Sequence, residues 1–168
     1  AQRNPGALGN AWFVNKVKLV ENADAEIAAL NDFDPTKTAI VDQRFSNHVA
    51  DSYAIDSAAN IKLTSYSPKK LEYKTKSKTK QLAVFSEVYY PAGWEASIDG
   101  KPAKHIRVNY ILRALEIPAG EHSVTFEFRP QSYYAGRNIS LASSIILILF
   151  VIGVFGVELR NYLRKEKE

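Results

Sequence analysis

The chain has 168 residues, with 22 Lys and Arg, 18 Asp and Glu, a formal net charge of +4, and neither cysteine nor methionine. The lack of cysteine excludes disulfides and cysteine-ligated metal, so a folded domain must rely on packing alone. The positive charge is spread thinly, with 18 basic and 15 acidic side chains before residue 138. No nucleic-acid readout motif accompanies it, which argues against a nucleic-acid partner.

Residues 1–59 are predicted to form a small α/β lobe. Residues 10–20 alternate imperfectly with a period of two, and we expect one strand there. Asn22 is a suitable N-cap for a short helix over 23–30. A short buried strand over 38–41 follows, and the rest of the lobe is polar and predicted to be a long loop.

Residues 60–137 are predicted to form an antiparallel β domain. Asp99-Gly100 is a strong signal for a two-residue hairpin turn. Strand patterns recur at roughly 8–12-residue spacing, which is typical of a sandwich or a barrel. We predict a mainly β fold, an antiparallel β-sandwich joined to the small α/β N-terminal lobe. The expected strands cover residues 61–66, 71–76, 82–90, 94–98, 101–108, 111–117 and 122–129.

Residues 138–157 form a run of twenty residues without a charge. As a helix this run is about 30 Å long, the thickness of the hydrocarbon core of a bilayer. We therefore predict one C-terminal transmembrane helix over 138–159. The tail 160–168 is rich in Lys and Arg, which favours the cytoplasmic side and predicts an extracytoplasmic β domain.

Aromatic residues gather around a Pro-Gly break in the β domain. Tyr89, Tyr90 and Trp94 could stack on a sugar ring, with Asp99 or Arg113 binding its hydroxyl groups. These five residues are the candidate glycan-binding residues. The alternative is that the aromatics are core residues, since large aromatics dominate cores. We expect the core role for Trp94 and exposure for Tyr90.

A run of lysines precedes the aromatic segment. Lys74, Lys76, Lys78 and Lys80 alternate, so on a strand they share one face. They are candidates for contact with anionic lipid or an anionic polymer. The alternative is a solvated face or a charged edge strand that blocks edge-to-edge pairing.

No catalytic set is visible in the sequence. The three histidines, His48, His105 and His122, have no metal-ligand spacing, and no nucleotide-binding or nucleophile motif is present. We therefore predict no catalytic residue, no metal and no cofactor for this chain.

Several motifs together resemble YfhO-family bacterial membrane proteins. The carrying residues are Tyr-Tyr-Pro-x-Gly-Trp at 89–94, Asp99-Gly100-Lys101, Asn109-x-x-x-Arg113-Ala114, Pro118-Ala119-Gly120-x-His122 and Phe128-Arg129-Pro130. The opening 4–13 and the stretch 30–35 are also similar to that family. The resemblance thus spans nearly the whole chain.

The resemblance implies a polytopic glycosyltransferase of the GT-C type in the bacterial plasma membrane, which takes a sugar from a polyprenyl-phosphate donor at the outer face. The catalytic acid of that class is expected in an early extracytoplasmic loop outside this chain. The chain alone is therefore not expected to be catalytic. The implied role is to support the catalytic membrane part or to hold a glycan or acceptor. The implied partners are the lipid bilayer, an upstream transmembrane portion of the same protein, and an envelope glycan or lipid-linked sugar.

The N-terminus carries neither a start methionine nor the apolar run of a signal peptide. We therefore expect the chain to be the C-terminal piece of a longer membrane protein. Two alternatives stay open: a stand-alone, single-span module that binds glycan, and a purely structural assembly module.

Overall fold

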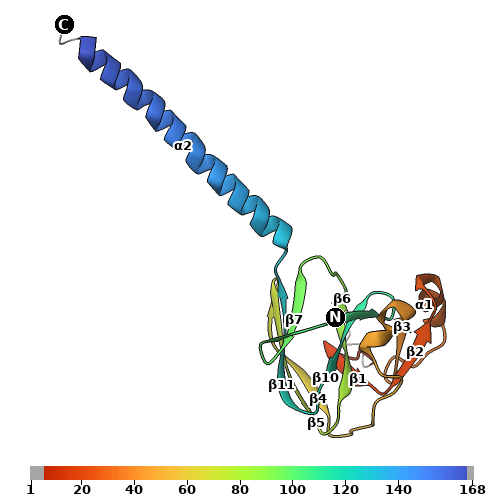
Figure 1. Ribbon diagram of the computed structural model, residues 1–168. Coiled ribbons are helices and arrows are strands. Elements are labelled where there is room, and N and C mark those ends of the chain that lie inside the picture. The colour runs from red at the N-terminus through yellow and green to blue at the C-terminus, as the bar shows by residue number, and fades with distance from the viewer. Residues whose placement is uncertain (1–5, 166–168) are drawn as a thin grey trace. The chain divides into compact units, whose positions relative to one another are not determined.

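The structure, a computed structural model, describes residues 6–165. The chain forms two compact units, one ending at Arg129 and the other beginning at Pro130. The first unit contains the strands and the second consists of one long helix (Figure 1).

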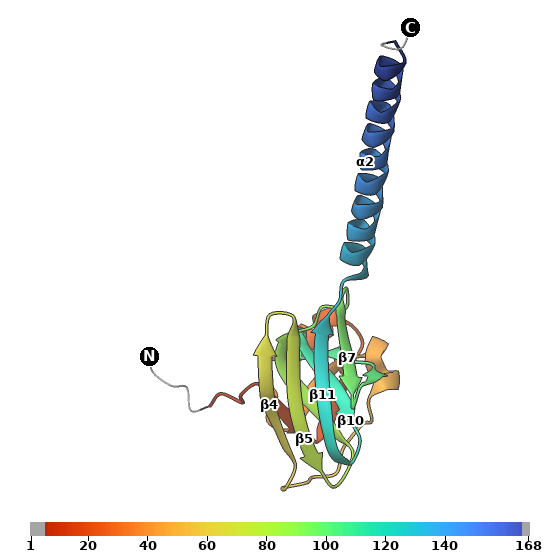
Figure 2. The same ribbon diagram turned by 90° about the vertical axis from the view of Figure 1, so that its left-hand side faces the viewer.

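The first unit is built around two antiparallel sheets, as predicted. The larger has the strand order β4-β5-β11-β7-β8 and the smaller β1-β6-β10-β9. Figure 2 shows β4, β5, β11 and β7 side by side across one face of the unit. The strands are β1 (Ala11–Val14), β4 (Asn60–Ser67), β5 (Lys70–Ser77), β6 (Gln81–Val88), β7 (Trp94–Ile98), β8 (Lys101–Ala103), β9 (Ile106–Val108), β10 (Leu112–Ile117) and β11 (Gly120–Phe128).

An apolar core fills the space between the two sheets. Tyr73, Phe85 and Phe126 come from three different strands and are each at most 1% exposed. Their rings meet edge to face, 4.9 Å apart for Tyr73 and Phe85 and 4.8 Å apart for Phe85 and Phe126. Each such pair contributes about 0.5–1.5 kcal/mol beyond the area it buries. This aromatic cluster couples the sheets at the centre of the sandwich.

The N-terminal lobe forms a third layer on the other face of the smaller sheet. It contains the parallel pair β2 (Lys16–Val20) and β3 (Thr38–Asp42), with α1 (Ala23–Ala29) and the 3-10 helix η1 (Gln43–His48). Strand β6 is consequently buried on both faces. Leu82 and Val84 pack against the lobe, and Ala83 and Phe85 pack against the larger sheet.

The single strand expected over residues 10–20 is wrong. The strand is interrupted at Asn15, so β1 joins the smaller sheet and β2 pairs with β3. At the break, Asn15 donates its backbone N–H to Lys37 O and accepts one from Tyr53 N. These bonds satisfy the backbone outside either ladder, which explains why the alternation through this stretch is imperfect.

The predicted short helix and its cap are confirmed. Asn22 lies in the extended region, and its Oδ1 accepts a hydrogen bond from Ala25 N at 3.0 Å. This is the bond that favours asparagine at an N-cap.

A buried charged pair fastens the lobe to the sandwich. Glu26 of α1 is fully buried, and its Oε2 accepts a bond from Arg107 Nη2 of β9 at 2.6 Å. Its Oε1 accepts a bond from Tyr110 N at 2.9 Å. Asn109 and Tyr110 have positive φ values of 49° and 70°, a conformation that is uncommon for residues with a Cβ. The carboxylate of Glu26 thus stabilises the turn between β9 and β10.

The single strand expected over residues 101–108 is also wrong, because the chain changes sheets within it. β8 pairs with β7 in the larger sheet, and β9 pairs with β10 in the smaller one. The change occurs at Lys104 and His105, and His105 is buried there.

The long helix α2 (Gln131–Lys165) forms the second unit. Among the described residues it is the one helix long and apolar enough to cross a membrane. Its apolar side chains are exposed along this stretch, which fits a segment whose surroundings are lipid.

Candidate functional site

A hollow of about 580 Å³ lies beside β7 and β8 in the first unit. The flat rings of Tyr89 and Trp94 contribute to its wall, together with the buried His105. Its polar and charged lining residues include Glu95, Ser97, Lys104, Thr125, Glu127 and Arg129.

The ring of Trp94 is held on its core side by an arginine. Trp94 is half-buried, and the guanidinium carbon of Arg113 lies 4.1 Å from the centre of its ring. The ring of Phe128 lies 5.4 Å away, centre to centre. These contacts fix the orientation of a tryptophan that also faces the hollow. Trp94 therefore packs against the core, as expected, and also lines the hollow, as a ligand-binding residue would.

Arg113 is itself an unusual core residue, 3% exposed. Its Nε donates to Val88 O at 2.8 Å, while its buried Nη1 has no hydrogen-bond partner among the described residues. Burial lowers the pKa of Arg113, although an arginine remains charged at any physiological pH. Arg113 therefore lies beneath the tryptophan rather than in the lining of the hollow.

His105 is a feature of the hollow that the sequence did not indicate. Its ring lies 5.4 Å from that of Tyr89 and 5.7 Å from that of Phe126, and Nε2 is buried without a hydrogen-bond partner among the described residues. Burial, and then the charge of Arg113, lowers the pKa of His105 to about 4. At neutral pH the imidazole is therefore uncharged, with one nitrogen able to donate and one able to accept. The sequence signal was weak, because His105 follows the change of sheets and has no motif around it.

Two acidic residues face each other across the strands beside Trp94. Glu95 of β7 is directly opposite Glu127 of β11. Glu127 pairs with Arg129 at 2.9 Å. Carboxylates opposite each other on neighbouring strands repel, and they also offer several acceptor oxygens to a hydroxyl-rich ligand.

The remaining two candidate glycan residues lie outside the lining of the hollow. Tyr90 is 52% exposed, which confirms its expected exposure, but it is not among the lining residues. Asp99 belongs to the hairpin, where Oδ1 accepts from Ser123 N at 2.8 Å and Oδ2 lies 2.6 Å from His122 Nδ1. The N–H of Ser123 and then the imidazole of His122 lower the pKa of Asp99. The geometry thus brings Tyr89 and Trp94 into the lining of one hollow, with Arg113 beneath the tryptophan.

The four candidate lysines separate into two pairs. Lys74 and Lys76 lie on the exposed face of β5, whereas the strand ends at Ser77, before the other two. Lys78 donates its backbone N–H to Asp56 at 2.6 Å, and Lys80 pairs with Glu116 at 2.9 Å. The expectation that all four share one strand face is therefore wrong, because the strand is shorter than the run.

The fold and the helix define a class of protein: a β-sandwich domain followed by one candidate membrane span. The model of the family described as bacterial membrane protein YfhO matches residues 37–140, and the chain belongs to this family. The matched region covers β3 of the lobe and the sandwich strands β4 to β11, including the whole lining of the hollow. No curated protein and no solved structure matches the chain.

Proposed function

We propose that the chain is the extracytoplasmic C-terminal domain and last span of a polytopic glycosyltransferase-like membrane protein, and that the sandwich holds a glycan or acceptor in the hollow beside Trp94. The chemistry of transfer is assigned to the upstream membrane part. Membership of the YfhO family and the apolar helix α2 support the membrane setting. The sugar-binding role is carried by the hollow.

The observation that carries the proposal is a flat ring, fixed from behind, in the wall of a polar hollow. Sugar rings present C–H faces that pack on aromatic rings, and their hydroxyls need acceptors and donors around the rim. Trp94 is immobilised by Arg113 and Phe128. A platform that is already ordered loses little conformational entropy when a ligand binds.

The polar side chains in the lining of the hollow suit hydroxyl groups. Glu95 and Glu127 supply acceptors, and Ser97 and Thr125 supply hydroxyls that both donate and accept. The neutral His105 adds a buried nitrogen that has no hydrogen-bond partner within residues 6–165. Leaving such a group unpaired costs free energy, and a ligand hydroxyl would remove that cost.

The test is saccharide binding by the full chain in lipid nanodiscs, first on a glycan array and then by titration of the best sugar. Glu95→Ala should weaken binding by about tenfold, which corresponds to about 1.4 kcal/mol. Tyr90→Ala is the matched control, because Tyr90 is exposed on the same segment outside the hollow. Its affinity should match that of the unmodified chain.

Trp94→Ala separates the platform role from the packing role. Loss of the half-buried ring should lower the free energy of unfolding by about 3 kcal/mol, at the lower end of the range for aromatic core residues. Sugar binding should be lost as well. The proposal is overturned if no saccharide binds, or if Glu95→Ala and Tyr90→Ala bind sugar equally well.

A further inference from the structure

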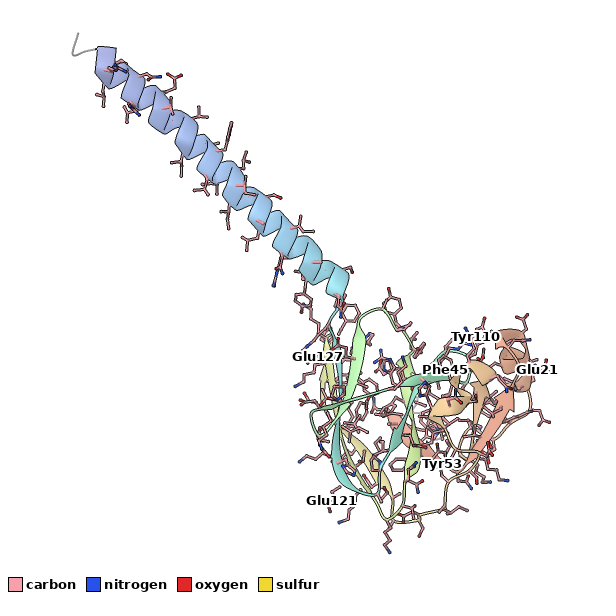
Figure 3. The ribbon with its side chains drawn as sticks, in the orientation of Figure 1. Glu21, Phe45, Tyr53, Tyr110, Glu121 and Glu127 are labelled. Atoms are coloured by element: carbon pink, nitrogen blue, oxygen red, sulfur yellow. The ribbon has the colours of Figure 1, made fainter. Side chains whose placement is uncertain are left out.

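We propose that Lys62 and Lys74 form a binding site for the phosphate group of an anionic ligand on the outer face of the larger sheet. This site is separate from the hollow beside Trp94. Lys76, beside the site, pairs with Glu121, whereas Glu127 lines the other hollow. Figure 3 shows these two glutamates toward opposite ends of β11.

The two lysines are direct neighbours across the strands. In the register of β4 and β5, Lys62 is opposite Lys74. Both are exposed, so their ammonium groups lie on the solvent face of the sheet. Like charges directly opposite each other destabilise a sheet. Both side chains lie outside the core, so core packing does not account for two lysines at these positions.

Other lysines on this face are neutralised, and these two are not. Lys70 pairs with Glu72 at 2.6 Å, and Lys76 pairs with Glu121 at 2.6 Å. Among the described residues, Lys62 and Lys74 have no carboxylate within ion-pair distance. The pair therefore carries two positive charges without an ion-paired acid among the described residues, whereas Lys70 and Lys76 of β5 each have one.

Protection of a sheet edge explains only one member of the pair. β4 is the edge strand of the larger sheet, and a lysine such as Lys62 discourages pairing with another chain. β5 lies between β4 and β11, so Lys74 is not on an edge. Edge protection therefore does not explain why the two lysines are directly opposite each other. Binding of an anionic ligand does explain it.

The surface at the pair is shaped to receive a ligand. A hollow of about 740 Å³ is lined by Lys62, Lys74 and Lys76. The side chains of Asn60, Thr64 and Ser123 also line it and offer hydrogen bonds to phosphate oxygens. A register shift between Leu63 and Ser65 interrupts the ladder beside Lys62, and such bulges redirect neighbouring side chains.

The test uses the full chain in nanodiscs of phosphatidylcholine, titrated with inorganic tripolyphosphate. The double variant Lys62→Gln with Lys74→Gln should lower the affinity at least about tenfold and reduce the dependence of binding on salt. Lys16→Gln with Lys18→Gln is the charge-matched control. It removes two exposed lysines from β2, in the N-terminal lobe, and should leave the affinity unchanged.

A second arm asks whether the phosphate belongs to a lipid headgroup. Flotation with vesicles of equal parts phosphatidylcholine and phosphatidylglycerol should recover the unmodified nanodiscs if it does, and leave them behind if the ligand is a soluble phosphate. Binding to either probe that depends on Lys62 and Lys74 supports the site. The proposal is overturned if neither probe binds, or if the control variant weakens binding as much as the site variant does.

Lys74→Glu provides an independent readout. The new carboxylate would face Lys62 and replace repulsion with attraction, so the melting temperature should rise while phosphate binding disappears. Phosphate binding that survives Lys74→Glu would overturn the proposal.

Discussion

At the scale of single residues, His105 and His122 respond to pH in opposite senses. Burial lowers the pKa of His105 to about 4, so the unfolded chain binds this proton more readily than the folded one. The contribution of His105 to stability is therefore complete above the ordinary histidine pKa of about 6.5 and is lost as pH falls toward 4. The carboxylate of Asp99, with Ala119 O, raises the pKa of His122. The stability from His122 is complete below pH 6.5 or so and is lost as pH rises through the elevated pKa.

Urea unfolding of the full chain in nanodiscs at pH 7 and pH 5 measures the effect of His105. The lowered pKa predicts that His105 alone makes the free energy of unfolding about 2 kcal/mol smaller at pH 5 than at pH 7. His105→Gln should abolish most of this loss. His122→Gln should enlarge the net loss, because it removes the stabilisation that His122 gains as pH falls. Parallel losses in the unmodified chain and in His105→Gln would show that other groups dominate.

The buried carboxylate of Glu26 supports a second residue-scale prediction. Glu26→Ala leaves Arg107 without its closest acid and Tyr110 N without its acceptor. Removing one partner of a buried pair costs about 3 kcal/mol or more. Chemical denaturation measures this cost, with Glu21→Ala as the control. Glu21 is exposed between β2 and α1, and Figure 3 labels it together with Tyr110. Equal effects of the two substitutions would contradict the role given to the buried pair.

At the scale of elements, the hairpin between β7 and β8 depends on one glycine. Gly100 has a φ of 77°, and a Cβ built on it meets nothing within 4 Å. The cost of a side chain there is therefore conformational rather than steric. Gly100→Val should lower the unfolding free energy by about 1 kcal/mol or more, and Gly100→Asn should cost less, because asparagine tolerates positive φ. Thermal melts of both variants test the turn, and equal melting temperatures would count against it.

The long helix allows a direct test of membrane integration. Leu147 and Val151 are exposed on α2, four residues apart on one face. Replacing both with Arg should cost about 6 kcal/mol of insertion free energy. The variant should then be extracted from membranes at alkaline pH, while Leu147→Phe with Val151→Leu stays bound. Retention of the arginine variant would contradict a spanning role.

Local patterns predicted most of these elements. The cap at Asn22, the turn at Gly100 and the alternation along β11 each follow from residues close together in the sequence. The breaks at Asn15 and at Lys104-His105 were missed because they depend on which sheet the next strand joins. In the site, the aromatic residues were found from their clustering. The pairing of Glu26 with Arg107 and the neighbouring position of Lys62 and Lys74 come from strands and helices brought together by the fold, which no local pattern records.

At the scale of the whole molecule, the proposed topology predicts an outcome for proteolysis. The basic residues after the apolar run favour a cytoplasmic C-terminus. Protease added to intact cells, or to spheroplasts where an outer membrane is present, should digest the sandwich and spare a tag placed after Glu168. Digestion of that tag in sealed cells would reverse the orientation.

The position of β11 in the larger sheet has a consequence for synthesis. β11 lies between β5 and β7, yet it is the last strand to leave the ribosome. Until residues 120–128 emerge, the β4-β5 and β7-β8 hairpins have no common partner, and each presents an unpaired edge. Only Arg129 and Pro130 separate the end of β11 from the start of α2. Completion of the sandwich and delivery of α2 to the membrane therefore occur at nearly the same moment of translation. A chain that stalls before residue 120 is left with two hairpins whose unpaired edges can associate with other chains.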